Sequence, residues 1–208
     1  REISGNVDNT IVLSTFDYGN VIVTYEDGKN TFSAAMIDLP QEEAGTNKNY
    51  IIKFQINNDS SLNNEIAIKW INLTNTFCQY ASSQECTNDS GDTYVADELS
   101  YQLYSCTLTQ YNNITDADDT DITSCTKISN STDQAVPTTG KTSRLQSNSK
   151  ITLTSNTISY YVVRVILKNL TTPQRYNMDK SFDGSINVEF YAPTLVDMIL
   201  EAHPPVSD

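Results

Sequence analysis

The sequence has few of the residues from which most enzyme sites are built. Its 208 residues include one histidine, one tryptophan and three methionines. A zinc site built on several histidines is excluded, and His203 stands in a proline-containing tail typical of an exposed linker. Motifs for zinc proteases, serine hydrolases, phosphate-binding loops and dinucleotide sites are also absent. A hydrolase that uses two carboxylates remains open, but no pair is singled out.

Positive charge is scarce too. Thirteen basic residues against 26 acidic ones give a formal net charge of −13. Such a surface repels phosphate backbones and anionic lipids, which argues against a nucleic-acid partner. No run of about 18 apolar residues occurs, so no membrane span is expected in this chain. It begins at Arg1 without methionine or an apolar leader, as expected after removal of a signal peptide or trimming.

Asparagine, serine and threonine make up about a third of the chain, and tyrosine occurs twelve times. These residues are poor to middling helix formers. Alternation of apolar and polar residues predicts nine strands. They are expected at 10–15, 20–25, 32–37, 50–57, 65–71, 99–108, 150–155, 158–168 and 184–191. Many short strands without a long amphipathic helix predict an all-β, two-sheet sandwich of jelly-roll type.

The expected organisation is an N-terminal extension, a sandwich and a tail. Residues 1–9 form the extension, and residues 10–192 form the sandwich, with polar insertions near 72–98 and 109–149 that we expect to be surface excursions. Residues 193–208 are expected to form one short C-terminal helix and a tail. The apolar residues at helical spacing are Leu195, Val196, Ile199 and Leu200.

Four cysteines in a chain rich in serine, threonine and asparagine predict two disulfides made in an oxidising compartment. Three pairings are possible. The local pairs, Cys78–Cys86 and Cys106–Cys125, are favoured because closing a short loop costs least. The second pair would pin the long polar insertion at its base. The alternative is four unrelated free thiols.

Three further patterns suggest ligands or modification. The acidic run of Asp116, Asp118, Asp119 and Asp121 is a weak calcium candidate that fails the EF-hand template, and a solvated acidic loop is the simpler interpretation. Exposed tyrosines, for example Tyr104, Tyr111 and Tyr160, could stack on sugars or pack across strands. Six glycosylation sequons also occur, a number that composition makes unsurprising. They are at Asn58, Asn72, Asn88, Asn113, Asn130 and Asn169.

The N-terminal extension has an extended pattern with little apolar area to hold it down. Ile3, Gly5 and Val7 alternate with polar neighbours. An extended peptide of this kind can add a strand to the open sheet edge of another subunit. Head-to-tail donation does not close on itself, so it generates a filament. The alternative is that the segment folds back onto its own sheet.

Four stretches in this order, 19–28, 50–73, 149–169 and 179–190, resemble the TasA/camelysin-like secreted proteins of Gram-positive bacteria. They read GNVIVTYEDG, YIIKFQINNDSSLNNEIAIKWINL, SKITLTSNTISYYVVRVILKN and DKSFDGSINVEF. The resemblance covers about half of the chain and contains no catalytic signature. It implies a jelly-roll domain, secretion and, for several members, fibres assembled by donor-strand exchange. Camelysin-type members are described as metalloproteases, but no histidine-based metal motif occurs here. The cysteine pairs and the insertion at 109–149 also depart from the family pattern.

These observations favour a structural protein without enzymatic activity or cofactor. We expect an extracellular subunit of a cell-surface or biofilm-matrix filament, with itself as partner and matrix polysaccharide as a further possible one. Acidic, asparagine-rich and threonine-rich loops would keep such fibres soluble. The alternative is a monomeric carbohydrate- or host-binding adhesin module, which the linker-like tail fits. A two-carboxylate hydrolase is the third hypothesis.

Overall fold

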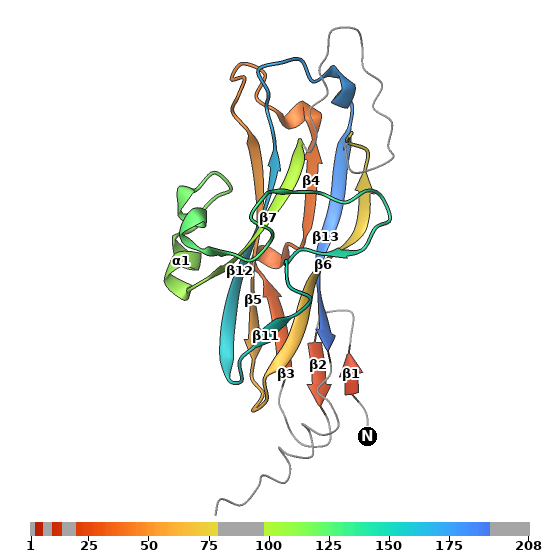
Figure 1. The fold of residues 1–208 in the computed structure, drawn as a ribbon. Helices are drawn as coiled ribbons and strands as arrows, with labels where there is room; N and C mark the ends of the chain where they lie inside the picture. The colour runs from red at the N-terminus through yellow and green to blue at the C-terminus, as the bar shows by residue number, and fades with distance from the viewer. Residues whose placement is uncertain (1–2, 6–9, 14–19, 79–97, 192–208) are drawn as a thin grey trace, which may run out of the picture.

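The computed structural model describes residues 3–5, 10–13, 20–78 and 98–191, and every structural statement below concerns these residues. They form two antiparallel sheets that pack face to face, as Figure 1 shows. The predicted all-β sandwich is confirmed. The predicted C-terminal helix at 193–208 lies outside the described residues.

Sheet A has eight strands. In spatial order they are β1 (Ile3–Gly5), β2 (Thr10–Leu13), β3 (Asn20–Tyr25), β5 (Lys48–Asn58), β12 (Thr157–Leu167), β7 (Leu99–Cys106) and β8 (Thr126–Lys127), with β9 (Gln134–Ala135) also on β7. Sheet B has five strands. They are β10 (Ser143–Arg144) and β11 (Ile151–Leu153), both paired with β6 (Asn64–Asn75), followed by β13 (Ser181–Tyr191) and β4 (Thr31–Ala35).

Helices are short. The α-helix in the described chain is α1 (Leu108–Asn113). Four 3₁₀ turns connect strands, and they are η1 (Glu26–Gly28), η2 (Met36–Asp38), η3 (Thr120–Ser124) and η4 (Arg175–Asn177). All nine predicted strands are present, with bounds that differ by a few residues.

The inward faces of the two sheets form one apolar core, as the alternation predicts. Trp70 of β6 is fully buried at its centre. Its ring lies 5.8 Å from Phe32 of β4, 5.5 Å from Tyr101 of β7 and 5.6 Å from Phe182 of β13, measured between ring centroids. Burial of these large side chains is the main stabilising contribution to the fold.

One continuous segment crosses from sheet A to sheet B. β3 pairs with the second half of β5, at residues 54–58. The chain then turns at η1, where Asp27 and Gly28 have positive φ angles, and continues as β4 beside the first half of β13, at residues 181–185. The described residues therefore leave one edge of β5 open over 48–53 and one edge of β13 open over 187–191.

The insertion at 109–149 is more than the surface excursion that the sequence predicted. β8 and β9 from this segment pair with β7 of sheet A, and β10 pairs with β6 of sheet B. Its residues Val136 and Leu145 are buried in the main core. The segment thus joins the two sheets. Val136 and Leu145 hold it there, because each fills a position in the main core.

The sandwich has two distinct ends. One end, called the groove end from here on, holds η2, η4 and the starts of β5 and β13. The opposite end, called the tail end, holds Tyr191, the last residue of β13, and Asn20, the first residue of β3. The strands β1 and β2 lie toward this end in Figure 1. At about 3.3 Å per residue, the eleven residues of β13 separate the two ends by roughly 35 Å.

Candidate functional site

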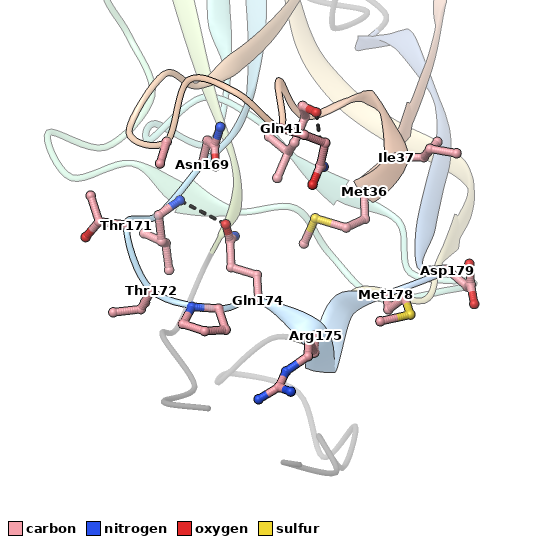
Figure 2. Close-up of a pocket in the computed structure, with 14 residues that line it drawn as sticks. Met36, Ile37, Gln41, Asn169, Thr171, Thr172, Gln174, Arg175, Met178 and Asp179 are labelled. Carbon is pink, nitrogen blue, oxygen red and sulfur yellow. Dashed lines mark hydrogen bonds between the residues drawn. The ribbon is translucent and has the colours of Figure 1, made fainter. Parts of the chain in front are cut away.

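An open groove of about 590 Å³ lies at the groove end. One wall is the segment from Met36 to Ala44 that follows β4, and the other is the loop from Asn169 to Asp179 between β12 and β13. Figure 2 shows the lining side chains between these two walls.

Apolar and polar side chains line the groove in equal number, and the apolar ones include large residues. Ile37 is 86% exposed and Met178 is 57% exposed, although both are large hydrophobic residues. Met36, Leu39 and Pro173 also line the groove. Exposed apolar side chains gathered in a concave site usually mark a contact surface, and methionine adapts easily to the shape of a partner.

Hydrogen bonds tie the two walls together. The Asn169 side-chain amide donates to the carbonyl oxygens of Pro40 at 2.7 Å and Glu43 at 3.1 Å. The Met36 backbone N–H donates to the Lys180 carbonyl at 3.0 Å. Because these bonds join the two walls within one chain, the shape of the groove does not depend on a bound partner.

A buried carboxylate supports the second wall from below. Glu98 has no exposed surface. It accepts hydrogen bonds from the side-chain amides of Gln174 at 3.0 Å and Asn177 at 2.6 Å, and from the Tyr176 hydroxyl. Burial raises the pKa of this carboxyl above its ordinary value of 4.5, and the hydrogen bonds from Gln174 and Asn177 and the charge of Lys168 oppose the shift. Glu98 therefore fixes η4 in place.

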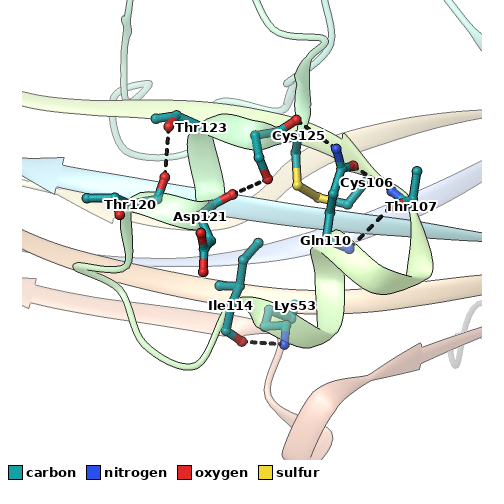
Figure 3. The surroundings of a disulfide bond; sticks show 10 residues. Lys53, Cys106, Thr107, Gln110, Ile114, Thr120, Asp121, Thr123 and Cys125 are labelled. Atoms are coloured by element: carbon teal, nitrogen blue, oxygen red, sulfur yellow. Dashed lines mark hydrogen bonds between the residues drawn. A yellow bond between two sulfur atoms is a disulfide. The ribbon is translucent and has the colours of Figure 1, made fainter.

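A second, smaller core lies on the outer face of sheet A (Figure 3). Residues 107–125 cover this face, and the Cys106–Cys125 disulfide closes them. Inside it, Tyr111 and Tyr160 have ring centroids 5.2 Å apart. The apolar and aromatic members pack on Val162.

Lys53 of β5 reaches into the edge of this second core. Its ammonium donates to the Ile114 carbonyl at 2.8 Å and lies 3.2 Å from a Glu26 carboxylate oxygen. It also lies 4.2 Å from the centroid of the Tyr111 ring. A cleft of about 190 Å³ opens here, lined by the open edge of β5 and by the acidic residues Asp27 and Asp116 among others.

The predicted cysteine pairing has two outcomes. Cys106–Cys125 is confirmed, with the Cα atoms 4.7 Å apart. Cys78 is buried, and its backbone N–H donates to the Asn177 side-chain oxygen at 2.8 Å. Its predicted partner Cys86 lies outside the described residues.

Two of the three tyrosines proposed as sugar-stacking residues are buried, and Tyr160 is partly buried. Tyr104 is 4% exposed and Tyr111 is 8% exposed, and Tyr160 packs against the same second core. The expectation of exposure is wrong for Tyr104 and Tyr111, because residues 107–125 cover this part of the outer face of sheet A.

The four aspartates of the acidic run do not converge on one point. Asp116 accepts from the Asp118 backbone, and Asp119 accepts from the backbones of Asp121 and Thr115. Asp118 accepts instead from the Asn49 side chain. Within the described ranges no three acidic, histidine or cysteine side chains gather to hold a metal ion. The geometry gives the calcium candidate no support, since the carboxylates shape local turns.

The sequons divide into two groups. Asn58 is fully buried and the Asn169 amide is used between the groove walls. Asn72, Asn113 and Asn130 are exposed. Asn88 lies outside the described residues.

The N-terminal candidates are described in part. Ile3–Gly5 forms β1, which pairs with Ile11–Leu13 of the same chain. This is the fold-back arrangement, and it extends over three residues of the described part of the extension. Val7 and His203 lie outside the described residues.

Comparisons with protein-family models, with curated proteins and with solved structures find no match for this chain. Across the described ranges, no helix has the length and apolar character needed to cross a membrane.

Sequence reasoning missed the groove and α1. The groove has no sequence motif, because its walls come from positions more than 120 residues apart. A signal for α1 was present in residues 107–110, which read Thr-Leu-Thr-Gln. The Thr107 hydroxyl caps the Gln110 N–H at 3.2 Å and the Gln110 side chain returns to the Thr107 N–H at 2.8 Å, a capping box.

Proposed function

We propose that this protein is a structural, non-enzymatic subunit of an extracellular surface or matrix filament. Copies join head to tail. Residues 1–9 of one copy leave their own sheet and pair with the open edge of β5, residues 48–53, on the next copy. The side chains of Ile3 and Val7 are the apolar anchors of the donated strand.

The observation that carries this proposal is the position of the open edge of β5. This edge belongs to the groove end, whereas β3, which follows the donor segment, begins at the tail end. A donor at one end and an acceptor at the other form a contact that does not close on itself, so addition continues into a filament. Unpaired backbone groups at such an edge are a template for an added strand.

The weak anchoring of β1 also supports the exchange. β1 pairs with β2 over three residues at the outer edge of sheet A. When β1 separates from β2, the few hydrogen bonds of a three-residue pairing are lost. Pairing of the donated strand along residues 48–53 would form more. The cleft at this edge carries Glu26, Asp27 and Asp116 against Lys29 and Lys53, and this excess of negative charge would attract the positively charged Arg1.

The disulfide supports the extracellular location, and the net charge fits the filament. The Cys106–Cys125 disulfide is of a kind that persists in oxidising compartments. The net charge of −13 would keep neighbouring fibres apart by repulsion.

Electron microscopy of negatively stained material is the first test. The protein from its source, and the purified chain at high concentration, should both form filaments with a regular axial repeat. Removing residues 1–9, or changing Ile3 and Val7 to serine at unchanged length, should abolish the filaments. Filaments that persist in both variants would disprove strand donation.

Cross-linking tests the acceptor edge. Ile3→Cys combined with Lys48→Cys places thiols on the donor and at the start of the acceptor, and a short bismaleimide should yield a ladder of covalent oligomers. The matched control is Ile3→Cys with Lys141→Cys, because Lys141 is also an exposed lysine but follows Gly140, whose N–H donates to Leu73 of β6 in sheet B. Equal ladders from both pairs would contradict the β5 acceptor.

A further inference from the structure

We infer that the groove at the groove end binds the C-terminal apolar segment, residues 193–200, of a neighbouring copy. This inference rests on the proposed head-to-tail assembly and adds a second contact to it. The two contacts use different residues at each end of the subunit, so each can be tested without the other.

The groove combines walls fixed by hydrogen bonds with exposed apolar side chains. Its walls are joined by the bonds of Asn169 and held from below by Glu98. Two large apolar side chains at its margin, Ile37 and Met178, are nevertheless exposed, and Ile37 is the most exposed large hydrophobic residue of the described chain. Fixed walls and open apolar side chains favour a ligand that supplies apolar area.

The segment that follows β13 supplies such area. Residues 193–200 read PTLVDMIL, in which Leu195, Val196, Ile199 and Leu200 share one face at helical spacing. An amphipathic helix of two turns buries its apolar face in a groove through residues spaced three and four apart. A helix this short is marginal alone in water, so a receptor surface is what stabilises it.

Direction decides which copy provides the segment. β13 begins beside the groove at Ser181 and carries the chain away from it to Tyr191, which Figure 1 shows as the blue strand running to the tail end. Tyr191, the last described residue before this segment, therefore lies roughly 35 Å from the groove of its own copy. A two-turn helix of eight residues spans only about 12 Å. In a head-to-tail arrangement Tyr191 comes next to the groove of the neighbour, within reach of a segment of this length.

Peptide binding to the full chain tests the inference. The probe is a fluorescein-labelled peptide of residues 193–203. The receptor is the full-length chain with Leu195→Ser and Ile199→Ser, which keeps the groove and disables the chain's own segment. At a protein concentration at which light scattering shows monomers, fluorescence anisotropy should give saturable binding.

A groove variant and a matched surface variant give the assay its specificity. Ile37→Asp places a charge in the groove without disturbing the core, and it should weaken peptide binding about tenfold or more. Leu108→Asp is the control, because Leu108 is 51% exposed and opens α1 away from the groove, where an acidic residue is well tolerated. Absent binding, or binding equal in both variants, would overturn the inference.

A measurement on the unmodified chain distinguishes binding of a neighbour's segment from binding of the chain's own segment. If the segment belongs to a neighbour, the dilute wild-type chain should bind the peptide as tightly as the serine variant does. Weaker binding by the dilute wild type, independent of its concentration, would show that each chain fills its own groove and would overturn the inference. Strand donation is measured separately, since peptide binding does not need residues 1–9.

Discussion

The carboxylate of Glu98 accepts a 2.6 Å hydrogen bond from the side-chain amide of Asn177, 79 positions further along the chain. This contact connects the start of β7 to η4 and so to the wall of the groove. A fully buried carboxylate is costly unless donors surround it, and Gln174 and Tyr176 provide the others.

This buried carboxylate predicts a specific pH dependence of stability. The pKa of Glu98 is raised in the folded chain above 4.5, so the folded state binds its proton more tightly than the unfolded state does. The stabilisation by that proton is present below the unfolded pKa and is lost as the pH rises through the folded pKa.

Comparison with Glu98→Gln isolates the effect from the other acidic groups. The free energy of unfolding of the wild type, minus that of Glu98→Gln, should decrease as the pH rises from below 4.5 to neutrality. Denaturant unfolding at a series of pH values measures it. A difference that stays constant or increases with pH would contradict the raised pKa.

Loss of the Cys106–Cys125 disulfide should destabilise the second core. The two cysteines are 19 positions apart, and closing a loop of this size stabilises a protein by about 3 kcal/mol. Cys106→Ala with Cys125→Ala should lower the free energy of unfolding by about that amount. Amide exchange should increase first over 107–125, while the main core around Trp70 keeps its protection. Uniform exchange across both cores would show that the disulfide supports the whole sandwich instead.

The buried sequon residue Asn58 is predicted to be structural. Its amide donates to the carbonyls of Leu62 at 3.0 Å, Leu153 at 3.1 Å and Thr154 at 3.1 Å. Asn58→Asp replaces the donor with an oxygen and should cost about 3 kcal/mol in urea unfolding. The matched control is Asn130→Asp, an exposed sequon position, which should change the unfolding free energy by less than about 0.5 kcal/mol.

The same geometry predicts which sequons can carry a glycan. Peptide mass spectrometry of the protein from its source should find Asn58 and Asn169 unmodified, because their amides are used inside the fold. Any glycan among the described sequons should be at Asn72, Asn113 or Asn130. A glycan on Asn58 would contradict the buried turn.

Gly184 in β13 is predicted to tolerate no side chain. A Cβ at this position would lie 2.5 Å from the Leu73 side chain and 2.6 Å from the Phe182 ring. It stands at an irregularity in the pairing of β13 with β6. Gly184→Ala should lower the free energy of unfolding by about 1–3 kcal/mol.

A double variant checks that the cause is the clash. Leu73→Ala removes the closest atom, so Gly184→Ala should cost less in that background than in the wild type. Thermal unfolding of the four chains gives the coupling. Strictly additive costs would place the defect in the contact with the Phe182 ring or in the backbone instead.

The sequence by itself determined the strands and the class of fold. In β5, Ile52, Phe54 and Ile56 alternate with polar residues, and this period of two places them in the core whatever the neighbouring strand is. The local pairing of Cys106 with Cys125 was also predictable, since short loop closure favours it.

Only the tertiary structure decided how those strands leave edges and grooves. No local pattern indicates that β3 leaves β5 after Tyr25 and continues in the other sheet, because the crossing depends on which strands occupy the neighbouring positions. Likewise, Tyr104 has an alternating pattern that fits an exposed face equally well, and it is buried because a distant disulfide-closed segment covers it. Period-two patterning specifies a face of a strand, and burial of the outer face requires a third layer that the pattern does not encode.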